Sequence, residues 1–370
     1  MALCARRRTL KLAVFILLSV LLQERGSAQS QPVWRFNLEQ VAYGRAPHEG
    51  SRIHTLEIGP RISFLGTDSI VAAFATSEAK QPPLSGKWTL HLIKLEASTG
   101  SLQLHKTIPL EGDDASIFVS ADNQLIVCLG TTVLLLSSEF QTIHKRELSK
   151  NREPHGSHPF LSLSPSGETL FVGNVERRTA DMTAEMLDSA TLEPLTTCKY
   201  SHPDWSVSIS DRFAATLDKR SNKVMVSEFC KQWEPVAKFD AKAYPTSIDF
   251  LSDDTLLLGV AHTFTVLQRN GTKLISVTWP NDQQVVGGRT LRDGRQFAVE
   301  GWFMSGPEIP HSRTQPHIEG TQLILYDVAT GAEGAAVKIK LGVAALAISP
   351  DGRMAAAMAD DDIRLFPLTK

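Results

Sequence analysis

Short apolar segments separated by tight polar turns recur along most of this chain. Each repeat has an apolar strand, a turn rich in Asp, Ser, Asn and Gly, and a second strand that is apolar almost throughout. A third and usually a fourth strand follow, and many of these alternate apolar with polar residues, as expected when one face of a strand meets solvent. The pattern predicts an all-β chain with no long amphipathic helix after residue 28. The seven paired segments are ISFLGTDSIVAAF, SIFVSADNQLIVCL, LSLSPSGETLFVG, VSISDRFAATL, IDFLSDDTLLLGV, GGRTLRDGRQFAV and LAISPDGRMAAAM.

The turns recur at a nearly constant interval. They are marked by Asp68, Asp122, Ser166, Asp211, Asp253, Asp293 and Asp351, which lie 54, 44, 45, 42, 40 and 58 residues apart. Most of these intervals are close to the roughly 40–45 residues of a four-stranded repeat unit. We therefore expect one domain of residues 29–370. Its seven units span about residues 61–112, 113–156, 157–203, 204–242, 243–282, 283–342 and 343–370, the last completed by residues 33–40.

Two stretches carry a family resemblance. ISPDGRMAAAMADDDIRLF and LILYDVATGAEGAAVKIKL resemble modules of WD-repeat and YVTN-type β-propellers, in which SPDG joins two inner strands and D-x-x-T-G joins two outer ones. The resemblance spans nearly all of residues 33–370 and is strongest in the third, sixth and seventh units. It implies an all-β, seven-bladed β-propeller. The missing Trp-Asp and Gly-His dipeptides make the chain resemble a divergent, exported bacterial relative.

The last unit is one strand short. Residues 343–370 contain three strands, whereas QPVWRFNLEQ precedes the first unit and belongs to none. An exposed sheet edge invites unwanted pairing. We therefore expect residues 33–40 to supply the outer strand of the last blade and so to close the ring. SRIHTLEIG is the alternative closing strand.

The connection in the sixth unit holds the main binding candidates. GWFMSGPEIPHSRTQPHIEG is unusually long, as is TSEAKQPPLSGK in the first unit, and long loops often carry function. Aromatic and Arg side chains are favoured anchors in interfaces, and His can bind a metal. Alternatively, the two aromatic residues fold onto their own blade and leave the His residues solvated. The candidates are Trp302, Phe303, His311, Arg313 and His317.

Three other loops of the same predicted face add further candidates. His155 and His158 in NREPHGSHPF could reach one metal ion, but zinc requires three or four ligands, and an ordinary polar turn is the alternative. Arg177 and Arg178 could bind an anionic group or form a solvated pair of charges. Trp205 lies in SHPDW, in the next loop between units.

Sharper catalytic motifs are missing from the sequence. It has no His-Glu-x-x-His, no Gly-x-Ser-x-Gly, no phosphate-binding glycine loop and no Cys/His ligand spacing. Asp249 lies on a predicted inner strand, either as a residue lining the channel or as a ligand of a metal there. The sequence therefore assigns no catalytic residue, no metal site and no cofactor.

The N-terminal segment differs from the rest in composition. A basic ARRRTLK, an apolar LAVFILLSVLL and a closing GSA form the pattern of a signal peptide over residues 1–28, with cleavage near Ala28. The apolar run is shorter than the roughly 20 residues of a membrane span. An uncleaved anchor and a twin-arginine signal are the alternatives. Without this segment the chain has 33 basic and 39 acidic residues, which disfavours nucleic-acid binding.

The remaining cysteines form no Cys-x-x-Cys pair. Cys128 lies in an apolar run and is expected to be a small buried residue. Cys198 and Cys230 could form a disulfide in an oxidising compartment, or both could be free thiols.

Three classes of function remain open. The favoured one is an exported, monomeric scaffold, periplasmic or extracellular, that binds a protein, peptide or glycan through its loop face without catalysis. The second is a propeller enzyme of the lactonase or quinoprotein-dehydrogenase type with its site at the central channel. YDVATGAEG resembles the quinoprotein repeat, but the regular Trp positions of that family are missing. The third is a structural component of envelope assembly, since a propeller fold does not by itself fix a function.

Overall fold

The computed structural model describes the greater part of the chain after residue 29. The described residues are 30–42, 52–54, 61–77, 88–110, 115–148, 160–175, 182–200, 207–218, 222–231, 234–241, 245–305, 317–340, 343, 345–359 and 361–369.

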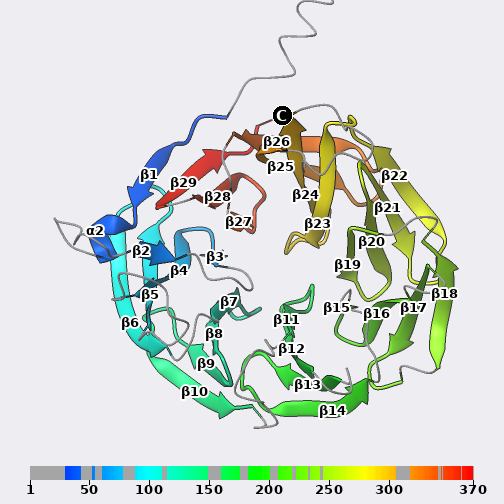
Figure 1. Ribbon diagram of the computed structural model, residues 1–370, viewed down its shortest axis with the longest axis horizontal. Coiled ribbons are helices and arrows are strands. Elements are labelled where there is room, and N and C mark those ends of the chain that lie inside the picture. The colour runs from blue at the N-terminus through cyan, green and yellow to red at the C-terminus, as the bar shows by residue number, and fades with distance from the viewer. Residues whose placement is uncertain are drawn as a thin grey trace, which may run out of the picture.

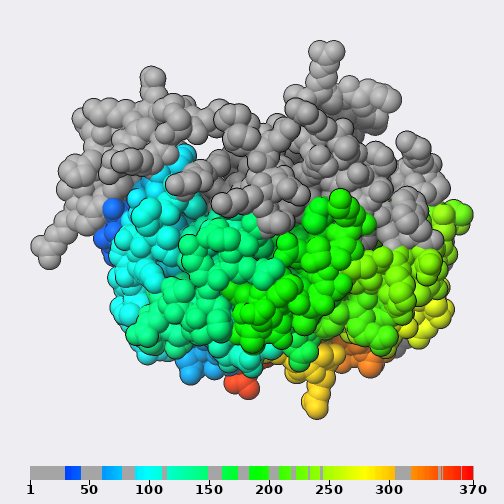
Figure 2. All heavy atoms as spheres, turned by 90° about the horizontal axis from the view of Figure 1, so that it is seen from below, coloured from blue at the N-terminus to red at the C-terminus, as the bar shows by residue number. Residues whose placement is uncertain are grey.

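Seven antiparallel sheets stand side by side around a central axis (Figure 1). Each sheet runs from an inner strand near the axis to an outer strand on the circumference, so the ring is a seven-bladed β-propeller. This confirms the predicted all-β, WD-repeat-like propeller. Figure 2 shows the ring edge-on, with the inner turns of blades 1 (blue), 6 (yellow) and 7 (red) projecting from its lower face.

The blades follow the chain in order. Blade 1 contains β2 (Arg52–His54), β3 (Ile62–Leu65), β4 (Ser69–Ser77), β5 (Trp88–Glu96) and β6 (Leu102–Leu110). Blade 2 contains β7 (Ala115–Val119), β8 (Leu125–Leu129), β9 (Thr132–Leu136) and β10 (Thr142–Glu147). Blade 3 contains β11 (Phe160–Leu163), β12 (Thr169–Val175), β13 (Met182–Asp188) and β14 (Pro194–Tyr200). Blade 4 contains β15 (Val207–Ile209), β16 (Phe213–Asp218), β17 (Lys223–Glu228) and β18 (Pro235–Asp240).

The remaining blades complete the ring. Blade 5 contains β19 (Ser247–Ser252), β20 (Thr255–Val260), β21 (Thr263–Gln268) and β22 (Lys273–Thr278). Blade 6 contains β23 (Gln283–Thr290), β24 (Gln296–Ser305), β25 (His317–Asp327) and β26 (Glu333–Ile339). Blade 7 contains β27 (Ala345–Ile348), β28 (Met354–Ala359), β29 (Asp362–Pro367) and the N-terminal β1 (Trp34–Asn37), which is followed by the short helix α2 (Glu39–Ala42).

A serine stabilises the inner turn, between the first and second strands, in blades 2, 3, 4, 5 and 7. In blade 7, Ser349 Oγ accepts the backbone N–H groups of Arg353 and Met354 at 3.1 and 2.9 Å. Ser120, Ser164, Ser210 and Ser252 accept backbone N–H groups in the same way. A short polar side chain can therefore satisfy the backbone where the strands separate, which explains why this turn recurs in the sequence.

The outer turn, between the third and fourth strands, contains one residue with a left-handed backbone in each of blades 1 to 6. In chain order these are Gly100, Phe140, Leu192, Cys230, Gly271 and Gly331, with φ between 57° and 89°. Glycine adopts this conformation without the steric cost that a Cβ introduces.

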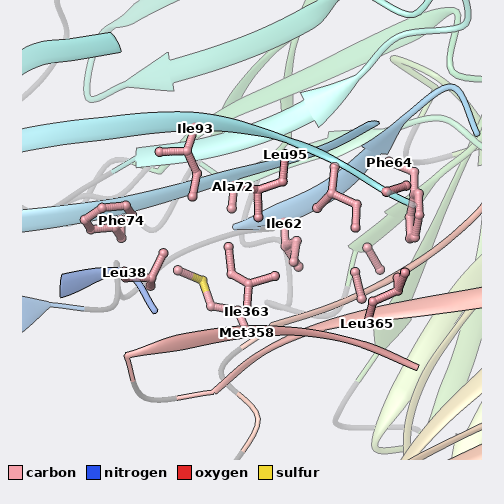
Figure 3. Close-up of a cluster of buried hydrophobic side chains, with 14 residues drawn as sticks. Leu38, Ile62, Phe64, Ala72, Phe74, Ile93, Leu95, Met358, Ile363 and Leu365 are labelled. Atoms are coloured by element: carbon pink, nitrogen blue, oxygen red, sulfur yellow. The ribbon is translucent and has the colours of Figure 1, made fainter. Parts of the chain in front are cut away.

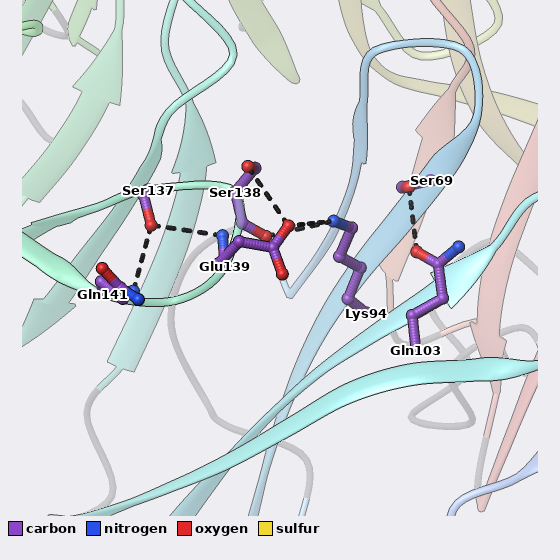
Figure 4. Close-up of polar contacts among 7 residues, drawn as sticks. All are labelled: Ser69, Lys94, Gln103, Ser137, Ser138, Glu139 and Gln141. Carbon is purple, nitrogen blue, oxygen red and sulfur yellow. Dashed lines mark hydrogen bonds and ion pairs between the residues drawn. The ribbon is translucent and has the colours of Figure 1, made fainter.

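Several outer turns also dock onto the preceding blade. A Cβ on Gly100 would lie 2.6 Å from the Trp34 ring of blade 7, and one on Gly271 would lie 2.9 Å from the Phe239 ring of blade 4. In blade 2, the turn of Ser137 to Gln141 meets blade 1 through Lys94, whose Nζ lies 3.2 Å from Ser138 O and 3.1 Å from Glu139 Oε1 (Figure 4). Between blades 3 and 4 the corresponding contact is covalent, because Cys198 and Cys230 form a disulfide with their Cα atoms 5.3 Å apart.

The buried apolar side chains form seven clusters, one at each boundary between neighbouring blades. Figure 3 shows the cluster between blades 7 and 1, where Leu38, Met358 and Ile363 pack against Phe74 and Ile93. Among the described residues, the cluster between blades 3 and 4 is the smallest. Its buried members are Phe171, Ala184, Met186 and Ile209.

The two ends of the described chain meet in blade 7. Strand β1 pairs antiparallel with β29, in a register that aligns Trp34 with Leu365 and Asn37 with Asp362. Arg35 forms an ion pair with the buried carboxylate of Asp362. Trp34 Nε1 donates to Ala97 O at 2.8 Å and so links this strand to the outer turn of blade 1. The SRIHTLEIG segment contributes β2, which pairs with β4 of blade 1 and not with β29.

Candidate functional site

A groove of about 510 Å³ opens between blades 4 and 5. The end of β18 forms one wall, and β20, β21 and β22 form the other. This volume is in the range of pockets that bind small molecules or single side chains. Its lining comprises Phe239, Asp240, Ala241, Leu258, Val260, Ala261, His262, Thr263, Thr265, Leu267, Gly271, Lys273 and Ser276.

The floor of the groove is apolar and belongs to the cluster between the two blades. Leu258 and Leu267 are each 7% exposed, and Phe239 and Val260 pack against the same cluster. Gly271 lies against the Phe239 ring at a distance that leaves no room for a Cβ. The two walls are therefore held together at the outer turn.

The rim of the groove is polar. Thr265 Oγ1 lies 3.3 Å from Ser276 Oγ, so this pair joins β21 to β22 across one wall. Lys273 and His262 add basic groups, and Asp240 is 3.8 Å from Lys223 at the other wall. An apolar floor below a hydrogen-bonding rim suits one apolar side chain whose neighbouring backbone remains polar.

The sequence did not predict this groove. Phe239, Val260 and Leu267 occupy ordinary core positions of strand patterns, and nothing in their spacing indicates that two neighbouring blades diverge here. The groove depends on the relative orientation of two sheets, and the hydrophobic periodicity of a sequence carries no information about that orientation.

Asp249 links blades 5 and 6 at the inner strands. Its Oδ2 accepts the backbone N–H of Gly288 at 3.0 Å. Two threonines add hydrogen bonds between the same blades, since Thr246 Oγ1 donates to Val285 O and Thr290 Oγ1 donates to Leu251 O. Burial raises the pKa of Asp249 to about 6, although the Gly288 N–H and the nearby Arg289 guanidinium favour its ionised form. The guanidinium of Arg289 is engaged by Glu300 at 2.9 Å. The carboxylate therefore serves the contact between these blades.

A chain of three polar side chains crosses blade 1. His91 Nε2 lies 2.9 Å from Thr76 Oγ1, and His91 Nδ1 lies 3.0 Å from His105 Nε2. This order of hydroxyl, imidazole and imidazole resembles a nucleophile with an oriented base. Burial, followed by the charge of His105, lowers the pKa of His91 to about 4, which makes its imidazole a weak base at neutral pH. Thr76, His91 and His105 thus join β4, β5 and β6, and the His91 ring stacks between those of Phe74 and His105.

The candidates predicted from the sequence are only partly within the described residues. Phe303 is 5% exposed, and its ring lies 4.8 Å from the Lys338 ammonium, while Trp302 on the same strand is half-buried. His317 begins β25. The binding roles of these residues stay predictions. Outside the described residues lie His155, His158, Arg177, Arg178, Trp205, His311 and Arg313.

The described residues contain neither a cluster of metal-binding side chains nor a membrane-spanning helix. No group of three or more His, Cys, Asp or Glu side chains in this part of the chain is arranged to hold a metal ion. Within the same residues, no helix is long and apolar enough to span a membrane.

Comparison with known proteins adds a fold likeness at very low sequence identity. No protein-family model and no curated protein matches the chain. Among solved structures, it is similar to the C-terminal WD40 domain of Sif2, at 9% identity and a TM-score of 0.49, over 93% of this chain and 100% of that chain. The seven-bladed β-propeller is established by the seven sheets of this chain and their recurring turns.

Proposed function

We propose that this chain is an exported β-propeller scaffold that binds an extended segment of a partner protein, with one apolar side chain of that segment seated between blades 4 and 5. The observation that carries the proposal is the groove of about 510 Å³ with an apolar floor and a polar rim. Lys273 at the rim favours an acidic residue next to the seated side chain, since the Asp240 carboxylate of the other wall already faces Lys223.

Two further features support the proposal. The blades are joined by buried apolar clusters at every boundary, so the ring can present a groove of fixed shape, which lowers the entropic cost of binding. Export is supported by the signal-peptide pattern of residues 1–28 and by the disulfide, because disulfides persist mainly in oxidising compartments. Trp302 on β24 and the two residues His311 and Arg313 that follow it in the sequence are proposed as additional contacts.

The groove is tested by selecting peptides from a random display library with the disulfide-bonded protein. We expect the selected peptides to share a large apolar residue beside an acidic one. Thr265→Trp places an indole over the groove and should weaken the affinity of those peptides at least about tenfold. Thr142→Trp is the matched control, because Thr142 is an exposed residue on the outer strand of blade 2, away from the groove.

Two results would contradict this assignment. One is a failure to enrich any peptide. The other is equal binding of the enriched peptides to the wild-type protein and to the Thr265→Trp variant.

Export is tested separately by sequencing the N-terminus of the protein recovered from cells that produce the full chain. We expect it to begin at Gln29, immediately after the small residues that end the signal pattern. A protein that retains Met1 would show that the segment is not removed.

A further inference from the structure

A second cavity lies at the end of the central channel, on the face that carries the inner turns. Its volume is about 140 Å³, and it is lined from four blades. Ser63 and Phe64 come from blade 1, Val119 comes from blade 2, and Ile348 belongs to blade 7. Blade 6 contributes the stretch from Arg289 to Arg292.

The inner turn of blade 6 differs from the turns that contain a capping serine. Leu291 takes the place of that serine and is 6% exposed, packed in the cluster between blades 6 and 7. A Cβ on Gly352 of blade 7 would lie 2.7 Å from Leu291 Cδ2, which shows how closely the two turns meet. The next residue, Arg292, is exposed, and its side chain extends across the end of the channel to the inner turn of blade 2.

Arg292 joins blade 6 to blade 2 across this opening. One terminal nitrogen of its guanidinium donates to Ser120 O at 2.9 Å and to Ala121 O at 3.0 Å. Both acceptors are neutral carbonyl oxygens, so the positive charge of Arg292 is not balanced by a carboxylate through these contacts. A guanidinium has five N–H donors, so two bonds from Nη2 leave the Nε–H and the two N–H groups of Nη1 for a ligand.

Two guanidinium groups, from Arg289 and Arg292, line the cavity, and its other described residues are apolar, hydroxyl-bearing or proline. Arg289 is already paired with Glu300, so Arg292 is the lining residue whose charge its described contacts leave unbalanced. Arginine is the side chain that best matches the planar, two-oxygen geometry of a carboxylate.

We propose that this cavity binds a carboxylate group carried on a short hydrocarbon chain. Arg292 donates to the carboxylate through the N–H groups of Nη1 and Nε, and Phe64, Val119 and Ile348 contact the chain. These apolar contacts favour an organic acid over inorganic phosphate, which has no hydrocarbon part. The volume corresponds to a few water molecules, which limits the ligand to a small acid or to the end of a peptide. This site is independent of the groove between blades 4 and 5.

Calorimetric titration of the disulfide-bonded protein with succinate, with its neutral diamide and with inorganic phosphate tests the proposal. A short peptide with a free C-terminal carboxylate and the same peptide with an amidated end separate the two sources of the group. We expect succinate or the free-acid peptide to bind, and the diamide, phosphate and amidated peptide not to bind. At tenfold over its dissociation constant, the ligand should raise the melting temperature by about 2 °C.

Variants at Arg292 decide whether binding uses this cavity. Arg292→Gln should weaken binding at least about tenfold, and Arg292→Lys should retain part of it, since the charge remains while the fork is lost. Arg295→Gln is the control, because Arg295 is exposed on the same turn and does not line the cavity. All titrations are carried out well below the melting temperature of each variant, so a loss of stability does not imitate a loss of binding.

Three results would overturn the proposal. In the first, no carboxylate ligand binds the wild-type protein. In the second, phosphate binds as tightly as succinate. In the third, Arg292→Gln and Arg295→Gln weaken binding equally.

Discussion

Two titratable groups, the half-buried Asp249 and the buried His91, respond to acid in opposite directions. Burial raises the pKa of Asp249 to about 6, and it lowers the pKa of His91 to about 4. Between pH 6 and 4 the folded protein binds a proton at Asp249 that the unfolded chain does not, so acidification stabilises the fold there. Between about pH 6.5 and 4 the unfolded chain binds a proton at His91 that the folded protein does not bind, so acidification destabilises the fold in that range. The pH dependence of the wild type therefore hides two effects that partly cancel.

Asp249→Asn separates these effects. An amide oxygen can still accept the Gly288 N–H, but it does not bear the cost of a buried charge. The stabilisation that a raised pKa gives is present at low pH and is lost as the pH rises through about 6. The variant should therefore equal the wild type near pH 4. It should exceed the wild type by up to about 3 kcal/mol in free energy of unfolding at pH 8. Urea unfolding at both pH values measures this, and a difference independent of pH would refute the assignment.

At the scale of the element, the outer turn is the unit that joins one blade to the next. The same left-handed position is glycine in blades 1, 5 and 6, where a Cβ would collide with the preceding blade, and it is Cys230 in blade 4. The disulfide thus replaces a packing contact at the boundary with the smallest described apolar cluster. A covalent link stabilises a boundary that has few buried side chains of its own.

This arrangement predicts a difference between two double variants without the disulfide. Cys198→Ala with Cys230→Ala should lower the free energy of unfolding by about 3–4 kcal/mol, as expected for a link across 32 residues. Cys198→Ala with Cys230→Gly should recover about 1 kcal/mol of that loss, because glycine tolerates the φ of 66° at this position. Urea unfolding of the two variants measures the difference. If the alanine pair is as stable as the glycine pair, the left-handed position does not limit this turn.

Whole-molecule features divide into those that the sequence could predict and those that it could not. The repeated turns fixed the number of blades, because Ser349 and Asp327 stabilise turns through local hydrogen bonds that each repeat must make for itself. The short last repeat pointed to an N-terminal strand as its completion. The groove and the reach of Arg292 to Ser120 were not predictable, since they join residues of separate blades whose relative placement no local pattern encodes. The pairing of Cys198 with Cys230 was left open for the same reason.

The N-terminal strand predicts the effect of shortening the chain. A protein that begins at Ser30 retains the bond from Val33 N to Leu365 O and all of β1. A protein that begins after Trp34 loses this bond, the indole contact with Ala97 and part of the strand pairing. We expect the first protein to melt like the untrimmed one and the second to melt several degrees lower. Trp34→Ala in the longer protein tests the indole alone. Equal melting temperatures for the two truncated proteins would show that β1 does not stabilise the ring.

The pairing of β1 with β29 also sets an order of events in biosynthesis. Of the strands in the ring, β1 leaves the ribosome first and its partner β29 leaves it last, about 325 residues later. Until then β29 has no outer neighbour and β1 has no sheet to join, whatever the intervening blades have already formed. Ring completion is therefore a late step that joins the two most distant parts of the chain, and contacts between such distant segments form slowly. A chain that lacks only β29 would keep six complete blades but would expose an unpaired edge at β28. Such an edge can pair with other chains, so synthesis of β29 removes a site of aggregation from the nascent molecule.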